Sequence, residues 1–264
     1  MRVAIAGASG RMGRMLIEAA LSFPDTTITV AFDRTDSHGF GGDCAAFLGR
    51  ATGVSVGADM TALSDADVLI DFTRPEATLA HIESCVAAGV NMVIGTTGID
   101  AAGKRIIEDA SKRIAIVFAP NMGIGVNAVF KLLELAGRIL REGFDVEIVE
   151  THHKHKVDAP SGTALKMGEV IAHTRGQVFD EVAVFNREGE VGERPANAIG
   201  FASVRGGDVV GDHTVLFAGT GERIEITHKA TSRMTYAVGS MRAARFLEGR
   251  RSGLFDMFDV LGLN

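Results

Sequence analysis

The chain has 264 residues, and its 27 lysines and arginines against 33 aspartates and glutamates give a formal net charge of −6. This acidic balance, without a long basic run, excludes nucleic acid as the main partner. No apolar run approaches the roughly 20 residues that a membrane-spanning helix needs. Glycines from position 7 come too early for the apolar region of a secretory signal. The two cysteines, Cys44 and Cys85, lack metal or redox spacing, so we expect a soluble protein of the reducing cytoplasm.

The first 120 residues alternate strand-like and helix-like segments. Apolar runs predict strands at 3–6, 27–32, 67–72, 91–97 and 114–121, and helical spacing predicts helices at about 12–23, 76–88 and 100–111. Short apolar strands separated by helices imply right-handed crossovers and a parallel sheet covered on both faces. The sequence therefore predicts a Rossmann-like, doubly wound α/β domain.

The pattern changes after Asn121. A helix is expected from about 125 to 141, and strands at 182–185, 198–205, 213–218 and 223–230 then follow one another with only turn signals between them. Consecutive strands without helices indicate an α+β domain with an open mixed or antiparallel sheet. Oligomerisation would cover the exposed face and edges of such a sheet. The last helical segment, 234–249, is a candidate to pack back on the first domain.

A glycine loop, "GASGRMG" at 7–13, lies between the first strand and the first helix. Its G-x-x-G-x-x-G spacing departs from the usual G-x-G-x-x-G, and a plain turn is the alternative. A tight turn at Gly7, close approach to a pyrophosphate at Gly10 and close helix–strand packing at Gly13 nevertheless suit a dinucleotide. The free N–H groups of the following helix would face the phosphates. The place of the loop after the first strand, with Asp33 ending the second, favours this interpretation.

The residues after the second strand leave the choice of cofactor open between NADH and NADPH. Asp33 can accept hydrogen bonds from the ribose hydroxyls, which favours NAD, and Arg34 can pair with a 2′-phosphate, which favours NADP. A solvated turn is the alternative for this pair. Further loops follow parallel strands at 95–98 and 119–125, where ligands bind in such sheets. The expected cofactor contacts are Gly7, Ala8, Ser9, Gly10, Arg11, Met12, Asp33, Arg34, Gly95, Thr96, Thr97, Ala119, Pro120, Asn121 and Met122.

A cationic stretch, "ETHHKHKVDAPSGTALKMGE" at 150–169, holds three histidines and two lysines within five positions. The stretch begins on a strand expected at 145–153. Ser161 is a good helix N-cap, so Gly162 and Thr163 would open a helix whose free N–H groups can hold a carboxylate.

Three interpretations of this stretch compete. A metal site would use His153 and His155, which share a face if the strand continues, but no third ligand accompanies them and the lysines would repel a dication. A solvated charged surface is the second. Proton transfer is the third and fits best, because imidazole titrates near neutrality and a lysine crowded by cations can release a proton. We therefore predict no metal site, and instead a pocket for a small di-anionic substrate.

The motif ETHHKHKVDAPSGTA, at 150–164, resembles the signature of the 4-hydroxy-tetrahydrodipicolinate reductases (dihydrodipicolinate reductases) of lysine biosynthesis by the diaminopimelate route. The segments "GASGRMG", "DFTRPE", "VIGTTG", "THKATSRMTYAVGSMRAARFL" and "GLFDM" are similar to that family as well, so the resemblance covers essentially the whole chain. One departure is Gly123, where the family has serine or alanine; it removes no group with a proposed chemical role.

The resemblance implies a homotetrameric enzyme that reduces a cyclic, unsaturated imine dicarboxylate to tetrahydrodipicolinate with NADH or NADPH. It implies His152 as the catalytic acid or base and Lys156 as a proton donor. His153 would contact the substrate, and Gly162 with Thr163 would bind one of its carboxylates. The expected division is a dinucleotide-binding domain at 1–123 and 233–264, and a substrate-binding and tetramerisation domain at 124–232.

Two other functions remain alternatives. A non-catalytic nucleotide sensor would keep the glycine loop but would have no reason to keep His152 and Lys156 beside a carboxylate site. A dehydrogenase that acts on aspartate semialdehyde would need a cysteine nucleophile in a loop at a strand end. Cys44 lies in "GGDCAAF" and Cys85 lies inside a predicted helix, so neither suits that chemistry.

Overall fold

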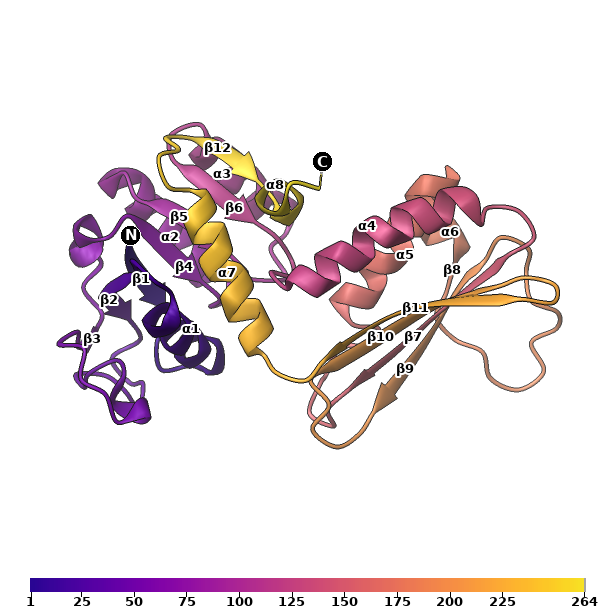
Figure 1. The fold of residues 1–264 in the computed structure, drawn as a ribbon, viewed down its shortest axis with the longest axis horizontal. Coiled ribbons are helices and arrows are strands. Elements are labelled where there is room, and N and C mark those ends of the chain that lie inside the picture. The colour runs from indigo at the N-terminus through magenta and orange to yellow at the C-terminus, as the bar shows by residue number, and fades with distance from the viewer. Residues whose placement is uncertain (264) are drawn as a thin grey trace. The chain divides into compact units, whose positions relative to one another are not determined.

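The structure, a computed structural model, describes residues 1–263. The chain forms two compact units, one made of Met1–Ile124 with Arg233–Asn264 and the other of Gly125–Ser232 (Figure 1). The observed boundary after Ile124 and the expected one after residue 123 differ by one residue. The chain therefore leaves the first unit, completes the second and then returns to the first.

The first unit contains a parallel sheet. Its strands, in spatial order, are β12 (Gly253–Phe255), β6 (Ala115–Phe118), β5 (Asn91–Ile94), β4 (Val68–Asp71), β1 (Arg2–Ala6), β2 (Thr27–Phe32) and β3 (Val56–Gly57). Every strand pairing in this sheet is parallel. Because β1 lies in the middle, strand order reverses there, which is the topological switch point where ligands bind in such folds.

Helices cover both faces of this sheet. They are α1 (Arg11–Ser22), α2 (Pro75–Ala88), α3 (Ala101–Ser111), α7 (Met234–Phe246) and α8 (Met257–Leu261). On one face Leu16 of α1 and Met241 of α7 pack with strand residues in one buried cluster. On the other face Ile82 of α2 and Ile107 of α3 do the same. Two cores on opposite faces confirm the predicted Rossmann-like, doubly wound fold and the return of the last long helix to this unit.

Some elements of the first unit were not predicted. Residues 37–66 contain β3 and two 3-10 helices, η1 (Ala46–Leu48) and η2 (Met60–Asp65), and the chain ends with β12 and α8. β3 and β12 have only two and three residues, too short to show a period. Asp43 organises the first excursion, because its carboxylate accepts hydrogen bonds from the amides of Ala45, Thr52 and Gly53.

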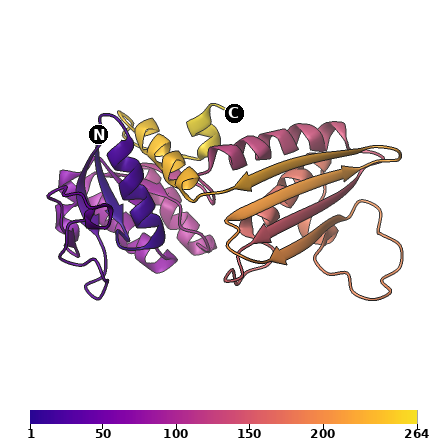
Figure 2. The same ribbon diagram turned by 60° about the horizontal axis from the view of Figure 1, so that its bottom comes forward.

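The second unit is a mixed sheet with helices, as predicted. The strand order is β11 (Arg223–Ala230), β10 (Gly211–Ala218), β7 (Asp145–His152), β9 (Ile199–Arg205) and β8 (Ala183–Val184), with β7 parallel to β9 and antiparallel to β10 (Figure 2). The helices are α4 (Ile124–Ile139), α5 (Gly162–Arg175) and the short α6 (Phe179–Val182). α5 packs on β7, β9 and β10. Along β7 the buried residues Val146, Ile148, Glu150 and His152 alternate with more exposed ones, so the polar pair lies on the face that α5 covers.

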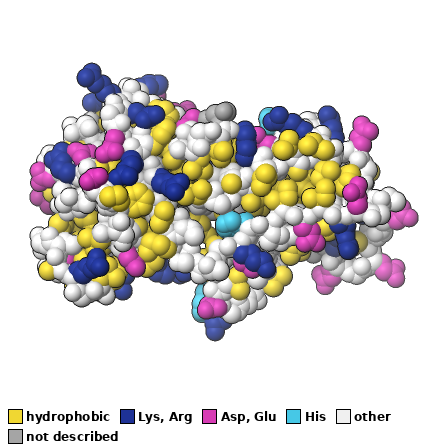
Figure 3. Space-filling view, in the orientation of Figure 1, with side chains coloured by type: hydrophobic (Ala, Val, Ile, Leu, Met, Phe, Trp, Pro, Cys, Tyr) yellow, Lys and Arg dark blue, Asp and Glu magenta, His cyan; other side chains and the backbone are white. Residues whose placement is uncertain are grey.

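The other face of this sheet and one side of α4 are open. Val149 and Val204, which face away from α5, are 40% and 48% exposed. On α4, Leu132, Leu135 and Ile139 are 52%, 56% and 69% exposed, and Figure 3 shows hydrophobic side chains gathered over that helix. Within residues 1–263, no helix is both long and apolar enough to cross a membrane.

Candidate active site

The glycine loop lies at the carboxyl end of β1. The amide of Gly10 donates to the carbonyl of Gly7 at 2.9 Å, which closes the turn. At Gly13 a Cβ atom would lie 2.1 Å from the Gly7 oxygen and 2.7 Å from Ala8 Cα, so α1 packs on the loop at a distance that only glycine allows. The backbone of residues 7–12 thus has the tight cradle and the helix start that a pyrophosphate needs.

Asp33 follows β2 and is attached to this loop. Its Oδ2 accepts a hydrogen bond from the Ser9 amide at 2.8 Å, and its Oδ1 accepts one from the Arg34 amide at 2.8 Å. The Arg34 side chain is 81% exposed and its Nε lies 3.3 Å from Asp36 Oδ1. The structure therefore brings the expected ribose carboxylate to the glycine loop and leaves the Arg34 guanidinium in solvent.

A pocket of about 250 Å³ lies beside the start of α1 in the same unit. It is lined by the expected residues Arg11, Met12, Pro120, Asn121 and Met122, together with Phe72, Arg233 and Tyr236. The last three were not predicted. Phe72 directly follows β4 at the carboxyl edge of the sheet, a position that could have identified it, whereas Arg233 and Tyr236 come from the segment that returns from the second unit. This set of residues suits the flat, uncharged nicotinamide end of a cofactor.

The remaining strand-end residues have different environments. A Cβ at Gly95 would lie 2.2 Å from Phe72 Cε1, so Gly95 makes room for the ring that lines the pocket. Thr96 is buried and its hydroxyl lies 2.7 Å from that of Thr78. Ala119 is buried, and Thr97 is exposed. Gly95 and Thr96 thus pack beneath the site without reaching its surface. Of these four residues, Thr97 is the one with a side chain that reaches solvent.

A buried carboxylate supports these strand ends. Asp71, with no exposed surface, accepts hydrogen bonds from the amide and hydroxyl of Thr73 at 2.8 and 2.6 Å. Its other oxygen lies 2.7 Å from His81 Nδ1 on α2. These contacts hold the loop after β4 in place, and only the aspartate that ends the strand could have indicated them.

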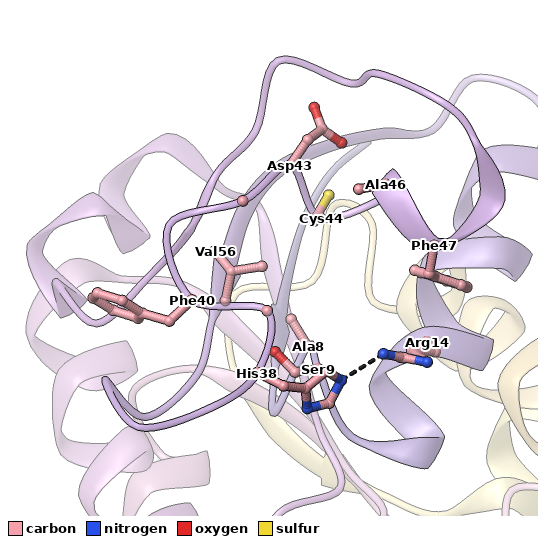
Figure 4. Close-up of a pocket in the computed structure, with 12 residues that line it drawn as sticks. Ala8, Ser9, Arg14, His38, Phe40, Asp43, Cys44, Ala46, Phe47 and Val56 are labelled. Atoms are coloured by element: carbon pink, nitrogen blue, oxygen red, sulfur yellow. Dashed lines mark hydrogen bonds between the residues drawn. The ribbon is translucent and has the colours of Figure 1, made fainter.

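A second pocket, of about 240 Å³, lies on the α1 side of the glycine loop (Figure 4). Ser9, Arg14, His38 and Phe47 are among its lining residues, and Arg14 contacts the ring of His38 through a hydrogen bond. The Arg14 guanidinium also lies 5.2 Å from the centroid of the Phe47 ring. This pocket was not predicted, because the segment that builds it has no regular period.

In the second unit, β7 ends at His152 and not at residue 153. His153 donates its amide hydrogen to the Val209 carbonyl at 2.8 Å, and the amide of Lys156 donates to the His153 carbonyl at 3.1 Å. His153 and His155 therefore lie in a turn, with ring centroids 6.3 Å apart. They do not share a strand face, because the chain turns as soon as the sheet ends. Among residues 1–263 there is no cluster of three or more histidine, cysteine or acidic side chains that could hold a metal.

His152 is buried at the end of β7 and contacts a carboxylate. Its Nδ1 lies 2.5 Å from Glu150 Oε2. Glu150 is 1% exposed, and both its oxygens accept hydrogen bonds from Arg205, at 2.7 and 2.8 Å. Burial alone would raise the pKa of Glu150, but the hydrogen bonds from Arg205 and Ser203 hold it at about 2. Burial lowers the pKa of His152 below its ordinary value, and the charge of Glu150 opposes that shift.

The start of α5 lies beside this pair. Ser161 caps the helix, since its Oγ accepts a hydrogen bond from the Ala164 amide at 3.1 Å, as predicted. Gly162 and Thr163 are the first two helical residues. The Ser161 hydroxyl also lies 2.8 Å from Nε2 of the buried His213. Burial lowers the pKa of His213 to about 3, so this imidazole is neutral.

Lys156 reaches a carboxylate rather than other cations. Its Nζ donates to both oxygens of Asp158, at 2.7 and 2.8 Å, and its side chain is 19% exposed. The sequence suggested that neighbouring cations crowd this lysine, but the structure also places the negative charge of Asp158 beside it, which offsets their repulsion. Asp158 therefore holds the Lys156 ammonium group in place.

Glu150, Arg205 and His213 were missed as site residues. Glu150 could have been found, because a residue two positions before His152 on a strand lies on the same face. Arg205 and His213 could not, because they reach the site through strand register: Arg205 is opposite His152, and His213 is opposite Glu150.

Comparisons with known proteins cover the whole chain. Family models described as "Dihydrodipicolinate reductase, N-terminus" and "Dihydrodipicolinate reductase, C-terminus" match residues 1–122 and 125–261. A 4-hydroxy-tetrahydrodipicolinate reductase of Cupriavidus metallidurans is 61% identical, with 100% of both chains covered. One of Herminiimonas arsenicoxydans is 59% identical, with 100% of this chain and 98% of the relative covered.

Solved structures agree. A dipicolinate-bound dihydrodipicolinate reductase from Paenisporosarcina sp. TG-14 superposes with a TM-score of 0.75 at 25% identity, covering 98% of each chain. A probable dehydrogenase from Thermotoga maritima, at 12% identity and a TM-score of 0.62, covers 98% of this chain and 92% of its own, and shares the fold alone.

Proposed function

The chain belongs to the dihydrodipicolinate reductase family, and from this premise we propose that His152 and Lys156 supply the proton for its reaction. It is an NAD(P)H-dependent oxidoreductase that reduces 4-hydroxy-tetrahydrodipicolinate, by way of the unsaturated cyclic imine, to tetrahydrodipicolinate in lysine biosynthesis. It is not a non-catalytic sensor. Identity near 60% over the full length of relatives with that activity is the observation that carries the function.

The cysteines agree with this function and not with aspartate-semialdehyde chemistry. Both thiols are buried. Burial raises the pKa of Cys44, and it raises the pKa of Cys85 to about 12. A nucleophilic cysteine must ionise near neutral pH, which a buried thiol with a raised pKa does not do.

The cofactor is NADH or NADPH, and when bound its nicotinamide supplies the hydride. The amides of Arg11 and Met12 at the start of α1 would bind the pyrophosphate, and Asp33 would accept hydrogen bonds from the ribose hydroxyls. Arg34 pairs with the 2′-phosphate when one is present. Pro120, Asn121 and Met122 line the nicotinamide pocket with Phe72. The fit rests on the glycine cradle, where a Cβ at Gly13 would clash.

The substrate carries two carboxylates, and the second unit offers complementary groups. One carboxylate would bind at Gly162 and Thr163, through the Gly162 amide and the Thr163 hydroxyl at the start of α5, where the helix dipole favours an anion. His153 lies in the turn before this helix and would contact the substrate. The Paenisporosarcina relative, named as dipicolinate-bound, gives a precedent for a planar ring with two carboxylates.

Hydride addition to the conjugated ring places an electron pair on the substrate, and one proton from the protein neutralises it. His152 is the acid or base at this step, and Lys156 is a second donor. Positioned acids of this kind contribute roughly 10²–10⁴-fold to a rate. Their neighbours differ, since His152 contacts a buried carboxylate and Lys156 a half-exposed one.

The assembly is a homotetramer built through the second unit, in the cytoplasm where amino-acid biosynthesis occurs. The open face of the mixed sheet, with Val149 and Val204, and the apolar side of α4 are surfaces that partner subunits can cover.

Consumption of NADH and NADPH with freshly prepared cyclic substrate tests the function. We expect oxidation of both nucleotides that depends on the substrate. Nucleotide binding without oxidation would contradict the reductase function, and oxidation with aspartate semialdehyde in its place would indicate another dehydrogenase.

A further inference from the structure

The ring of His152 is held in one orientation by its neighbour on the same strand. Nδ1 lies 2.5 Å from Glu150 Oε2, and Glu150 is an acceptor only, because its pKa of about 2 keeps it ionised at neutral pH. Nδ1 therefore carries a hydrogen in both charge states of the imidazole. Nε2 makes no hydrogen bond with any residue from 1 to 263, so it is the nitrogen left for a substrate.

Glu150 is itself fixed from two sides. Arg205, on the adjacent strand β9, donates to both carboxylate oxygens, and such paired contacts define orientation as well as energy. The Ser161 amide donates to Oε1 at 3.2 Å from the start of α5. The same carboxylate thus contacts both the His152 ring and the residue that caps the proposed carboxylate site.

The backbone opposite the ring also leaves room for this orientation. A Cβ at Gly211 of β10 would lie 3.0 Å from His152 Nε2 and 3.4 Å from its Cδ2. On the same strand, the ring of His213 meets that of His152 edge to face, with centroids 5.0 Å apart. The imidazole is therefore confined by β10 on one side and by Glu150 on the other.

We infer that Glu150 is a positioning residue that sets the proton donor and the carboxylate site together. It holds His152 with Nε2 free, and through Ser161 it fixes the start of α5. Arg205 keeps Glu150 in place. This inference rests on the proposed role of His152, since a fixed Nε2 matters only if that nitrogen transfers a proton.

The charge of Glu150 also affects the pH at which His152 loses its proton. The groups that face His152 are Glu150 on its own strand, Arg205 on β9, the neutral His213 on β10, and Lys156 in the following turn. Glu150 is the one among these four that favours the imidazolium. Without its charge, burial and the two cations act unopposed, and the pKa of His152 falls further.

The experiment compares Glu150→Gln with wild type and with Glu147→Gln. Glu147 lies on the same strand but on the opposite face, paired with Arg187 and Arg194, so it is a matched carboxylate without contact to the site. The limb of the kcat profile that falls with rising pH should move to lower pH by about 1–3 units in Glu150→Gln, the usual effect of an adjacent opposite charge. The Michaelis constant for the substrate should rise as well, because a carboxamide has one acceptor oxygen and cannot accept from both His152 Nδ1 and the Ser161 amide. Glu147→Gln should leave the limb in place.

A measurement on the unaltered protein does not depend on how Glu150→Gln folds. Nitrogen-15 NMR of the imidazoles should show neutral His152 with hydrogen on Nδ1. Hydrogen on Nε2 in the neutral ring, or an unmoved limb in a folded Glu150→Gln protein, would overturn the inference. If the proposed function were wrong, the result would differ. His152→Ala would then keep the turnover rate of wild type, although NMR would still show hydrogen on Nδ1 of His152.

Discussion

The amide of Ser9 donates a hydrogen bond to Asp33 Oδ2 at 2.8 Å, and this bond attaches the end of β2 to the glycine loop. Asp33 is thereby oriented before any ribose binds, and each carboxylate oxygen keeps a further lone pair for a hydroxyl. Arg34 is the next residue, and among residues 1–263 its guanidinium forms an ion pair with the exposed Asp36. The two proposed nucleotide contacts therefore differ. Asp33 is held by the glycine loop, whereas the Arg34 side chain is exposed and can move to contact a 2′-phosphate.

Arg34→Ala should weaken the binding of NADPH and leave that of NADH unchanged. The expected loss is about 1.5–3 kcal/mol, the value of a hydrogen bond to a charged group. Titration of both nucleotides measures it. Asp36→Ala is the control, because it releases Arg34 from its surface partner and should bind NADPH at least as well as wild type. An equal loss for both nucleotides would show that Arg34 does not contact the 2′-phosphate.

The periodic parts of the fold were predictable and the irregular parts were not. β1, β2, β4, β5 and β6 are apolar runs of four to six residues that a parallel sheet buries on both faces. β3 and β12 are too short to show a period, and each depends on a neighbouring strand that is already in place. Residues 37–66 are organised by the carboxylate of Asp43, a long-range effect that no local pattern reveals.

In the candidate site, too, the residues that lie close in sequence were predictable and those that lie far apart were not. His152, Lys156 and the start of α5 lie close in sequence, so their residue types and the Ser161 cap were enough to predict a polar pocket. Arg205 and His213 lie more than 50 residues further along the chain and reach it through the register of β9 and β10. Register depends on the whole sheet, so the surroundings of His152 required the structure.

Gly95→Ala should lower the affinity for both nucleotides. The new Cβ would lie 2.2 Å from two atoms of the Phe72 ring, so the ring must leave its place in the pocket beside Met12 and Met122. Titration with NADH measures the loss, which we expect to exceed tenfold, about 1.4 kcal/mol. Gly57→Ala is the matched control, since nothing lies within 4 Å of its Cβ. If Gly95→Ala kept the wild-type affinity for NADH, Phe72 would have no role in cofactor binding.

The free energy of unfolding should fall as the pH drops below about 6.5. His213 has a folded-state pKa of about 3 against an ordinary 6.5, so between these values the unfolded chain binds a proton that the folded chain does not. The pKa of Glu150 is about 2 in the folded chain against an ordinary 4.5, so Glu150 also lowers the free energy of unfolding as the pH drops below about 4.5. Each group contributes at most about 1.4 kcal/mol per pH unit. Urea unfolding at pH 7, 6 and 5 should show a shallower decline for His213→Gln, and equal slopes would contradict a neutral buried His213.

The purified protein should be a tetramer, near four times 27.8 kDa. Val149 and Val204 lie on the face of the mixed sheet that no helix of the described chain covers, and burial between subunits removes this apolar area from water. Light scattering at micromolar concentration measures the mass. Val204→Lys should shift the protein to smaller species, because it places a charge in the interface. A monomeric mass for the wild-type protein would contradict the proposed tetramer, because the open face of the sheet would then have no partner subunit.

Substitution of the proposed proton donors should affect turnover and not nucleotide binding. His152→Ala or Lys156→Ala should lower kcat by about 10²–10⁴-fold, because an acid that protonates the substrate acts in the transition state. Thr163→Val should instead raise the Michaelis constant more than it lowers kcat, since a carboxylate contact is present before and during the reaction. Steady-state kinetics with NADH titration separates the two patterns. The nucleotide affinity should stay near that of wild type in all three variants.

His155 provides the control within the cationic stretch. Its ring lies in the turn after β7, 6.3 Å from that of His153, whereas the His152 ring is fixed under α5 by Glu150. His155 has no proposed role, so His155→Ala should change kcat and the Michaelis constant only slightly. If His155→Ala reduced turnover as much as His152→Ala, and added zinc restored neither, proton donation could not be assigned to His152 within this stretch. The difference between these two histidines, three positions apart, is therefore the most direct measure of the proposed mechanism.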